Sequence, residues 1–255
     1  MKEKNQRDDI SNLFETWKNV NDVDPVAADN ILIAQPVIHD IISDNLYSEK
    51  PINILDYWCW AWWFMIDLAQ KGNFVVWVDA SNNMLVLANK NIWKLQKKYR
   101  KNIIATIFWD DTSLIKNPEL MWKFDLITSI MALQFIPNED IELTIQNISK
   151  WLKDNGMIIF AIRNKDRIKE GIEWYDRFKH LETLKDWTIN CSVDFNWTWI
   201  NSYNRTAEIY DNIFDWMWFE KIHQASPPFT KEFIEKYNRD DPYKNSEYLI
   251  LAYRK

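Results

Sequence analysis

Apolar and polar positions in residues 51–162 alternate between short apolar runs and longer segments with helical spacing. A short uninterrupted apolar run predicts a strand buried on both faces, and apolar residues spaced by about one turn predict a helix face. The predicted strands span 52–56, 74–79, 103–108, 124–129 and 156–162, and the predicted helices span 63–71, 83–98 and 139–153. This alternation predicts an α/β fold with a doubly wound parallel sheet.

The flanking segments extend and interrupt this pattern. Residues 11–46 have helical spacing, whereas 164–204 are polar and aromatic, with a hairpin predicted around 187–193 and 199–203. A helix is predicted at 205–214, and strands at 218–224 and 247–253. We expect the last strand to run antiparallel, which would complete a mostly parallel, seven-stranded sheet.

The same pattern predicts how the chain is organised. Residues 1–50 are interpreted as an N-terminal helical segment and 51–255 as one α/β domain. Residues 164–204 are interpreted as an insert in that domain. An insert placed late over an α/β sheet either caps the substrate pocket or forms a surface excursion, and we favour the cap.

Composition changes the picture in one respect, because the chain has 3 Gly and 16 Trp. A glycine share of about 7% would give about 18 glycines in a chain of this length. The glycine and tryptophan counts together come close to that expectation. The chain is also rich in Asn, Ile and Lys, whose codons are AT-rich. Some genetic codes read UGA as tryptophan and others read it as glycine. We hypothesise that many of these tryptophans stand where the native protein has glycine.

The positions of the tryptophans support this hypothesis. Residues 56–63, Asp-Tyr-Trp-Cys-Trp-Ala-Trp-Trp, lie between a predicted strand and a predicted helix, and with glycine they become Asp-Tyr-Gly-Cys-Gly-Ala-Gly-Gly. A strand-to-helix turn beside a ligand needs glycine, which allows positive φ and close backbone approach. Trp77, Trp109 and Trp218 lie in similar contexts. The alternative is a strand whose Trp side chains form one aromatic face.

Charge and cysteine content restrict the classes of partner. The formal net charge is −6, and nucleic-acid binding requires a basic surface. Two cysteines do not form a disulfide framework, and neither suggests a metal site. The polar N-terminus lacks the apolar core of a signal peptide, and no apolar stretch is long enough to span a membrane. We therefore expect a cytoplasmic protein that binds neither nucleic acid nor membrane. The oligomeric state is not predicted.

With these residues placed, the chain resembles the class I S-adenosylmethionine-dependent methyltransferases, whose fold is Rossmann-like. The loop at 56–62 resembles the family's acid followed by GxGxG, and 77–85, 110–111 and 124–137 resemble its next motifs. The resemblance implies S-adenosylmethionine as cofactor, and it implies that the N-terminal helical segment, residues 1–50, is a lid. The implied cofactor-binding residues are Asp56, Trp58, Cys59, Trp60, Trp62, Asp79, Ala80, Met84, Asp110, Asp111 and Ile130.

The resemblance also implies how three acids act. Asp56 would orient the amino group of the cofactor, Asp79 would accept hydrogen bonds from both ribose hydroxyls, and Asp110 would accept from the adenine amino group. A single acid at a strand end is usually a turn or cap residue. Three acids after three successive strands, each in its motif context, are specific.

The acceptor of the methyl group is less well defined. The segment 129–132, Ser-Ile-Met-Ala, lacks the Pro-Pro-aromatic pattern of enzymes that methylate exocyclic amines, and with the acidic charge this favours a small-molecule acceptor. A general base is needed only for some acceptors, so His180 and Gln134 are weak catalytic candidates. Two alternatives remain open: a nicotinamide-dependent oxidoreductase, and a non-catalytic protein if the tryptophans are real.

Overall fold

The computed structural model describes residues 33–46, 50–57, 62–79, 82–107, 123–171, 178–195, 198–229, 231, 234–235 and 247–255. Its main element is a seven-stranded sheet in the order β3-β2-β1-β4-β5-β10-β9. The strands are β1 (Asn53–Tyr57), β2 (Phe74–Asp79), β3 (Ile103–Ile107), β4 (Phe124–Ile130), β5 (Leu152–Arg163), β9 (Glu220–Ala225) and β10 (Tyr248–Arg254).

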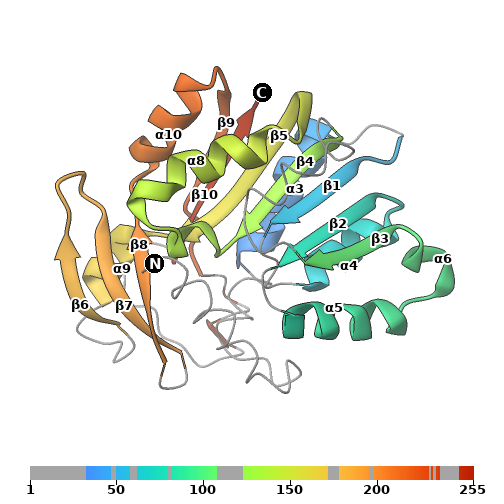
Figure 1. The fold of residues 1–255 in the computed structure, drawn as a ribbon, viewed down its shortest axis with the longest axis horizontal. Helices are drawn as coiled ribbons and strands as arrows, with labels where there is room; N and C mark the ends of the chain where they lie inside the picture. The colour runs from blue at the N-terminus through green and yellow to red at the C-terminus, as the bar shows by residue number, and fades with distance from the viewer. Residues whose placement is uncertain are drawn as a thin grey trace.

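The directions of the strands confirm the predicted fold class. β1 pairs in parallel with β2 and β4, and the outer pairs β2–β3 and β4–β5 are also parallel. β10 lies between β5 and β9 and is antiparallel to both. The sheet is therefore mostly parallel, with the reversed last strand that the sequence predicts (Figure 1).

Helices cover both faces of this sheet. One core cluster contains residues of α3 (Gln35–Leu46), α4 (Trp62–Gln70) and α5 (Asn82–Lys94), packed on one face. A second cluster contains residues of α8 (Asn138–Ser149) and α10 (Ala207–Trp216), packed on the other. Neighbouring residues of one strand enter different clusters: Ile54 belongs to the first and Leu55 to the second. Burial on both faces explains why these strands read as uninterrupted apolar runs.

A second, smaller sheet is built from the segment interpreted as an insert. It is antiparallel, in the order β6-β7-β8, with β6 (Phe178–Thr183), β7 (Ile189–Phe195) and β8 (Thr198–Asn204). β7 and β8 confirm the predicted hairpin, whereas β6 and the short helix α9 (Lys165–Gly171) were not predicted. Figure 1 shows this sheet on the side toward which the arrowheads of β4 and β5 point.

Two predicted helix ends are wrong. The helix predicted at 83–98 is two helices, α5 and α6 (Lys97–Arg100), because Gln96 between them has an extended ψ of 141°. The helix predicted at 139–153 ends at Ser149, and β5 begins at Leu152. The pairing of β4 with β5 shifts register between Leu152 and Met157. Residues 152–156 therefore form an irregular start of the strand and not a further helical turn.

The predicted N-terminal helix is described in its last part. Residues 11–32 lie outside the described residues, and α3 confirms helix at Gln35–Leu46. Ile38, Ile41 and Ile42 are buried in the first core cluster, as their spacing indicates. α3 therefore packs on the main sheet.

Candidate functional site

The strand order reverses between β1 and β4, because β2 and β3 lie on one side of β1 and β5 lies on the other side of β4. In open α/β sheets, ligands bind outside the carboxyl ends of the strands at such a switch point. Asp56 near the end of β1 and Asp79 at the end of β2 are both buried here. The structure therefore brings two of the three predicted acids to one edge of the sheet.

Asp56 has the most perturbed acidity at this edge. Burial raises the pKa of its carboxyl to about 7, and the nearby charge of Asp79 also raises it. The Oγ1 hydroxyl of Thr128 on β4 donates a 2.8 Å hydrogen bond to Asp56 Oδ1, which opposes the rise. A cationic ligand beside Asp56 would favour the ionised carboxylate.

The end of β4 forms the next part of the edge. Ile130 is the last residue of β4 and is buried, and Met131 follows with a positive φ of 56°. The backbone N–H of Met131 donates to the carbonyl of Ala161 on β5 at 2.7 Å. This left-handed turn directs the chain into the 3-10 helix η3 (Leu133–Phe135), which carries Gln134.

Gln134 is a buried polar residue whose amide nitrogen is hydrogen-bonded. Its Nε2 donates to the carbonyl of Met131 at 2.9 Å and contacts the Met131 sulfur at 3.7 Å. Its Oε1 is buried and has no hydrogen-bond partner among the described residues. A buried acceptor of this kind costs about 1–3 kcal/mol when unsatisfied, so it suits a donor supplied by a ligand.

The other predicted site residues are placed less completely. Trp58, Cys59, Trp60, Ala80, Asp110 and Asp111 lie outside the described residues. Trp62 is the first residue of α4, Met84 lies in the first turn of α5, and His180 lies on β6. Their backbones are described, and their side-chain contacts are not. The structure therefore leaves the tryptophan loop and the adenine-binding acid as predictions.

Three described tryptophans occupy unusual environments. Trp187 and Trp218 each have a φ of 64°, and their side chains are 67% and 91% exposed. Trp77 is fully buried in β2, and its indole N–H has no hydrogen-bond partner among the described residues. Buried tryptophans usually satisfy this N–H. The positive φ of Trp187 and Trp218 suits glycine better than tryptophan, whereas the ring of Trp77 fills space in the first core cluster.

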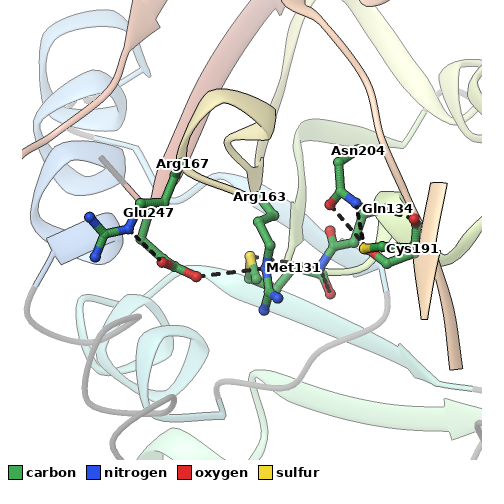
Figure 2. Close-up of polar contacts among 8 residues, drawn as sticks. Met131, Gln134, Arg163, Arg167, Cys191, Asn204 and Glu247 are labelled. Carbon is green, nitrogen blue, oxygen red and sulfur yellow. Dashed lines mark hydrogen bonds and ion pairs between the residues drawn. The ribbon is translucent and has the colours of Figure 1, made fainter. Parts of the chain in front are cut away.

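A charged cluster lies beside the ends of β4 and β5. Arg163 ends β5, Arg167 lies in α9, and Glu247 precedes β10. The two Glu247 oxygens face the Nε atoms of Arg163 and Arg167 at 3.7 Å and 3.6 Å. Figure 2 shows Glu247 between the two arginines, with Arg163 on the side of Met131. The sequence analysis missed this cluster, because its members are far apart in sequence.

A third buried arginine joins the small sheet to the η3 turn. Arg205 follows β8, and its guanidinium donates to the carbonyls of Leu133 at 3.1 Å and Tyr203 at 3.4 Å, and to that of Ile136. Two of these carbonyls flank Gln134. The arginine thereby fixes the turn that presents the glutamine amide.

The described residues contain no group of three or more His, Cys, Asp or Glu side chains that could hold a metal ion. No described helix is long and apolar enough to cross a membrane.

Comparison with known proteins agrees with this geometry. A family model described as a methyltransferase domain matches residues 63–158. The chain is 26% identical over 243 residues to the malonyl-[acyl-carrier protein] O-methyltransferase of Buchnera aphidicola subsp. Baizongia pistaciae, covering 89% of this chain and 90% of that protein.

Solved structures show the same fold. An S-adenosylmethionine dependent methyltransferase from Mesorhizobium loti matches with a TM-score of 0.56 and 17% identity, over 86% of this chain and 96% of that chain. The 1,6-didemethyltoxoflavin-N1-methyltransferase of Burkholderia thailandensis, with 1,6-didemethyltoxoflavin and S-adenosylhomocysteine bound, matches with a TM-score of 0.59 and 12% identity. That match covers 98% of this chain and 86% of the other.

With the sheet order and the switch-point acids, these matches identify the chain as a class I S-adenosylmethionine-dependent methyltransferase, with S-adenosylmethionine as its cofactor. They confirm the methyltransferase prediction and favour it over the nicotinamide-dependent alternative. The buried acids suit this cofactor, because it carries a positive sulfonium and a positive amino group.

Proposed function

We propose that this methyltransferase acts on a small-molecule acceptor bound where the β4–α8 connection, the end of β5 and the small sheet meet. The observation that carries the proposal is the buried Gln134 Oε1, which has no hydrogen-bond partner among the described residues. Gln134 lies beside the carboxyl end of β4, and Arg205 from the small sheet holds the turn that carries it. Gln134 would accept a hydrogen bond from the acceptor, and so position it rather than remove its proton.

The cofactor would lie along the adjacent ends of β1 and β2. In this proposal Asp79 binds the ribose hydroxyls, Asp56 orients the amino group, and Ile130 packs against the cofactor. When bound, the cofactor supplies a methyl group that is already activated by the sulfonium. The protein has to align the acceptor with that methyl group and exclude water.

The segments outside the main sheet would complete the site. Residues 164–204 would act as the cap over the acceptor, because β6, β7 and β8 stand beside the ends of β4 and β5 (Figure 1). Residues 1–50 would act as a lid that α3 anchors on the main sheet. Each covering segment would serve to keep water from the transferring methyl group.

The test is a methyl-transfer assay with the purified full chain. Labelled S-adenosylmethionine is offered with small alcohols, amines and carboxylic acids, among them the malonyl thioester of N-acetylcysteamine, a fragment of the acceptor named for the Buchnera relative. We expect label in a small product and stoichiometric S-adenosylhomocysteine. Transfer to nucleic acid or protein fractions, with none to any small acceptor, would refute the proposal.

Gln134→Ala and Gln134→Glu separate positioning from proton removal. If Gln134 accepts a hydrogen bond from the acceptor, Q134A should raise KM about tenfold, as expected for the loss of one buried hydrogen bond. Q134E should keep part of the acceptor affinity, because one carboxylate oxygen still accepts while the other loses the hydrogen bond that Nε2 donates to the Met131 carbonyl. A loss of kcat with unchanged KM in both variants would contradict a positioning role.

A further inference from the structure

The joint between the small sheet and the main sheet contains buried polar atoms without partners. Thr188 precedes β7, Arg205 follows β8, and Asn138 is the first residue of α8. Thr188 Oγ1, Arg205 Nε and Asn138 Oδ1 are buried and have no hydrogen-bond partner among the described residues. A buried polar atom without a hydrogen bond is costly, so each of the three needs a partner.

Thr188 and Arg205 lie opposite each other on one face of the small sheet. β7 and β8 are antiparallel, and the outermost pair of their ladder at this end is Ile189 with Asn204. The same register places Thr188 opposite Arg205, and directly opposed residues carry their side chains on the same face, about 5 Å apart at Cβ. The two residues are 0% and 1% exposed. Their unpaired atoms therefore face one buried region.

The same face of the small sheet contacts the start of α8. Arg205 donates to the carbonyl of Ile136, which lies two residues before Asn138. Tyr203 has its ring 5.6 Å from the Arg205 guanidinium carbon. Burial raises the pKa of the Tyr203 hydroxyl, the negative charge of Glu139 in the first turn of α8 raises it further, and the Arg205 guanidinium opposes the rise. The first turn of α8 therefore lies against Arg205 and its neighbours.

Asp186 connects Asn138 to Thr188. Its Oδ2 accepts from Asn138 Nδ2 at 3.0 Å, and its Oδ1 accepts from the backbone N–H of Thr188 at 3.0 Å. The contacts thus run from Arg205 through Ile136, Asn138 and Asp186 to Thr188, and return across the strand pair to Arg205. This closed ring of contacts brings the three unpaired atoms together.

Tyr210 of α10 adds a fourth polar atom to the ring. Burial raises the pKa of its hydroxyl, and the positive charge of the adjacent Arg205 guanidinium opposes that rise. The hydroxyl oxygen is buried and has no hydrogen-bond partner among the described residues. The Tyr210 hydroxyl is therefore a second donor, beside the N–H at Arg205 Nε.

We propose that this ring binds an internal water molecule, which accepts from Arg205 Nε and the Tyr210 hydroxyl and donates to Thr188 Oγ1 and Asn138 Oδ1. Two donors and two acceptors match the hydrogen-bonding capacity of one water. An anion would face two oxygen acceptors, and a cation would face a guanidinium, so neither suits this set. The water joins the small sheet to α8 and α10, whatever the methyl acceptor is.

A high-resolution crystal structure of the full chain tests the site directly. We expect one water oxygen at about 2.7–3.2 Å from Thr188 Oγ1, Arg205 Nε and Asn138 Oδ1. Direct hydrogen bonds among these side chains without a water between them, or an ion in place of the water, would overturn the inference.

Variants of Thr188 test the site in solution. Thr188→Val removes the hydroxyl and keeps the shape of the side chain, whereas Thr188→Ser keeps the hydroxyl. Magnetic relaxation dispersion of the water signal counts the waters that a protein holds for longer than its tumbling time. We expect T188V to hold one such water fewer than the parent chain, and T188S to hold the same number. An unchanged count in T188V would contradict the proposal.

Hydrogen exchange provides a second readout and a control. In T188V the backbone amides of β7 and β8 should exchange about tenfold faster than in the parent chain, because the joint loses its water. Ser192→Ala removes a hydroxyl further along the same face of β7, which donates to Asn201 at 3.4 Å, and should change neither readout. Exchange in T188V that is as slow as in the parent chain would overturn the inference. Far-UV circular dichroism reports whether each variant is folded.

Discussion

At the scale of single residues, Trp187 and Trp218 are the strongest structural sign that some tryptophans replace glycine. Both have a positive φ, which costs an L-residue roughly 1–2 kcal/mol and glycine almost nothing. Both side chains are exposed, so little packing is lost on their removal. Trp187→Gly and Trp218→Gly should each raise the free energy of unfolding by about 1 kcal/mol in urea denaturation.

The matched control is Trp93→Gly. Trp93 is also exposed but lies in α5, where glycine costs about 1 kcal/mol relative to good helix formers. The two classes of substitution should therefore change stability in opposite directions. Destabilisation by W218G as large as that by W93G would contradict the glycine interpretation at 218.

The tryptophan loop gives a second prediction at this scale. Replacing Trp58, Trp60 and Trp62 together with glycine should strengthen S-adenosylmethionine binding at least tenfold in calorimetry, because three ring systems leave the predicted cofactor loop. Equal affinities of the two versions would refute this. The codons provide an independent check: UGA at these positions, in a host that reads it as glycine, is expected, and UGG is not.

Asp56 predicts how stability and cofactor binding depend on pH. Burial raises its pKa in the folded state to about 7, above the unfolded value of 3.8. Between about pH 4 and pH 7 the Asp56 carboxyl holds a proton in the folded state that it has released in the unfolded state. The free energy of unfolding therefore falls as pH rises through this range, and Asp56 causes no further change above it. Asp56→Asn should remove this slope from denaturation midpoints.

Cofactor affinity should change in the opposite direction with pH. S-adenosylmethionine is cationic, and it binds the ionised carboxylate better, so affinity should rise from about pH 6 to about pH 8. D56N should bind weakly and show no such rise in calorimetry. A pH-dependent affinity of equal size in D56N would assign the titration to another group.

At the scale of elements, Arg205 holds the small sheet to the turn that carries Gln134. Arg205→Met would leave the buried carbonyls of Leu133 and Ile136 without this donor, at about 1–3 kcal/mol for each unsatisfied group. We expect R205M to lower the free energy of unfolding by about 2 kcal/mol or more and to raise acceptor KM. Arg205→Lys should restore part of both, and a loss of kcat alone would contradict this role.

Periodicity predicted the elements of the main sheet better than their ends. Apolar runs located six of the seven strands, because each of these is buried in the core clusters, whereas β9 is mostly polar and only Ile222 of it packs against the first core cluster. It failed at Gln96, where one extended residue divides a helical pattern, and at Leu152, where an irregular strand start imitates helical spacing. Neither local deviation changes the order of apolar and polar residues.

The candidate site was predicted in part for a similar reason. Asp56, Asp79 and Gln134 follow strands in recognisable motifs, so the sequence located them before the fold was known. Arg163 and Glu247 are brought together by the antiparallel pairing of β10 with β5, which no local pattern encodes. Contacts between residues far apart in sequence require the topology first.

At the scale of the whole molecule, the formal net charge is −6. The field of this charge repels an anionic acceptor at long range and leaves a neutral one unaffected. Raising ionic strength from about 10 mM to about 150 mM should therefore lower KM for anionic acceptors about twofold, since salt screens the long-range repulsion. Steady-state kinetics with a neutral acceptor provides the control, and an increase in KM with salt would contradict the argument.

The position of β10 also constrains synthesis of the protein. β9 is made before β10, yet among the described strands it joins the sheet only through β10, which lies between it and β5. During translation, β9 cannot join the sheet until β10 has been made. Until then the outer edge of β5 is unpaired and can bind strands of other chains. A ribosome that stopped between codons 164 and 247 would release a chain with β5 but without β10, so premature termination there should appear first as aggregation rather than as reduced activity.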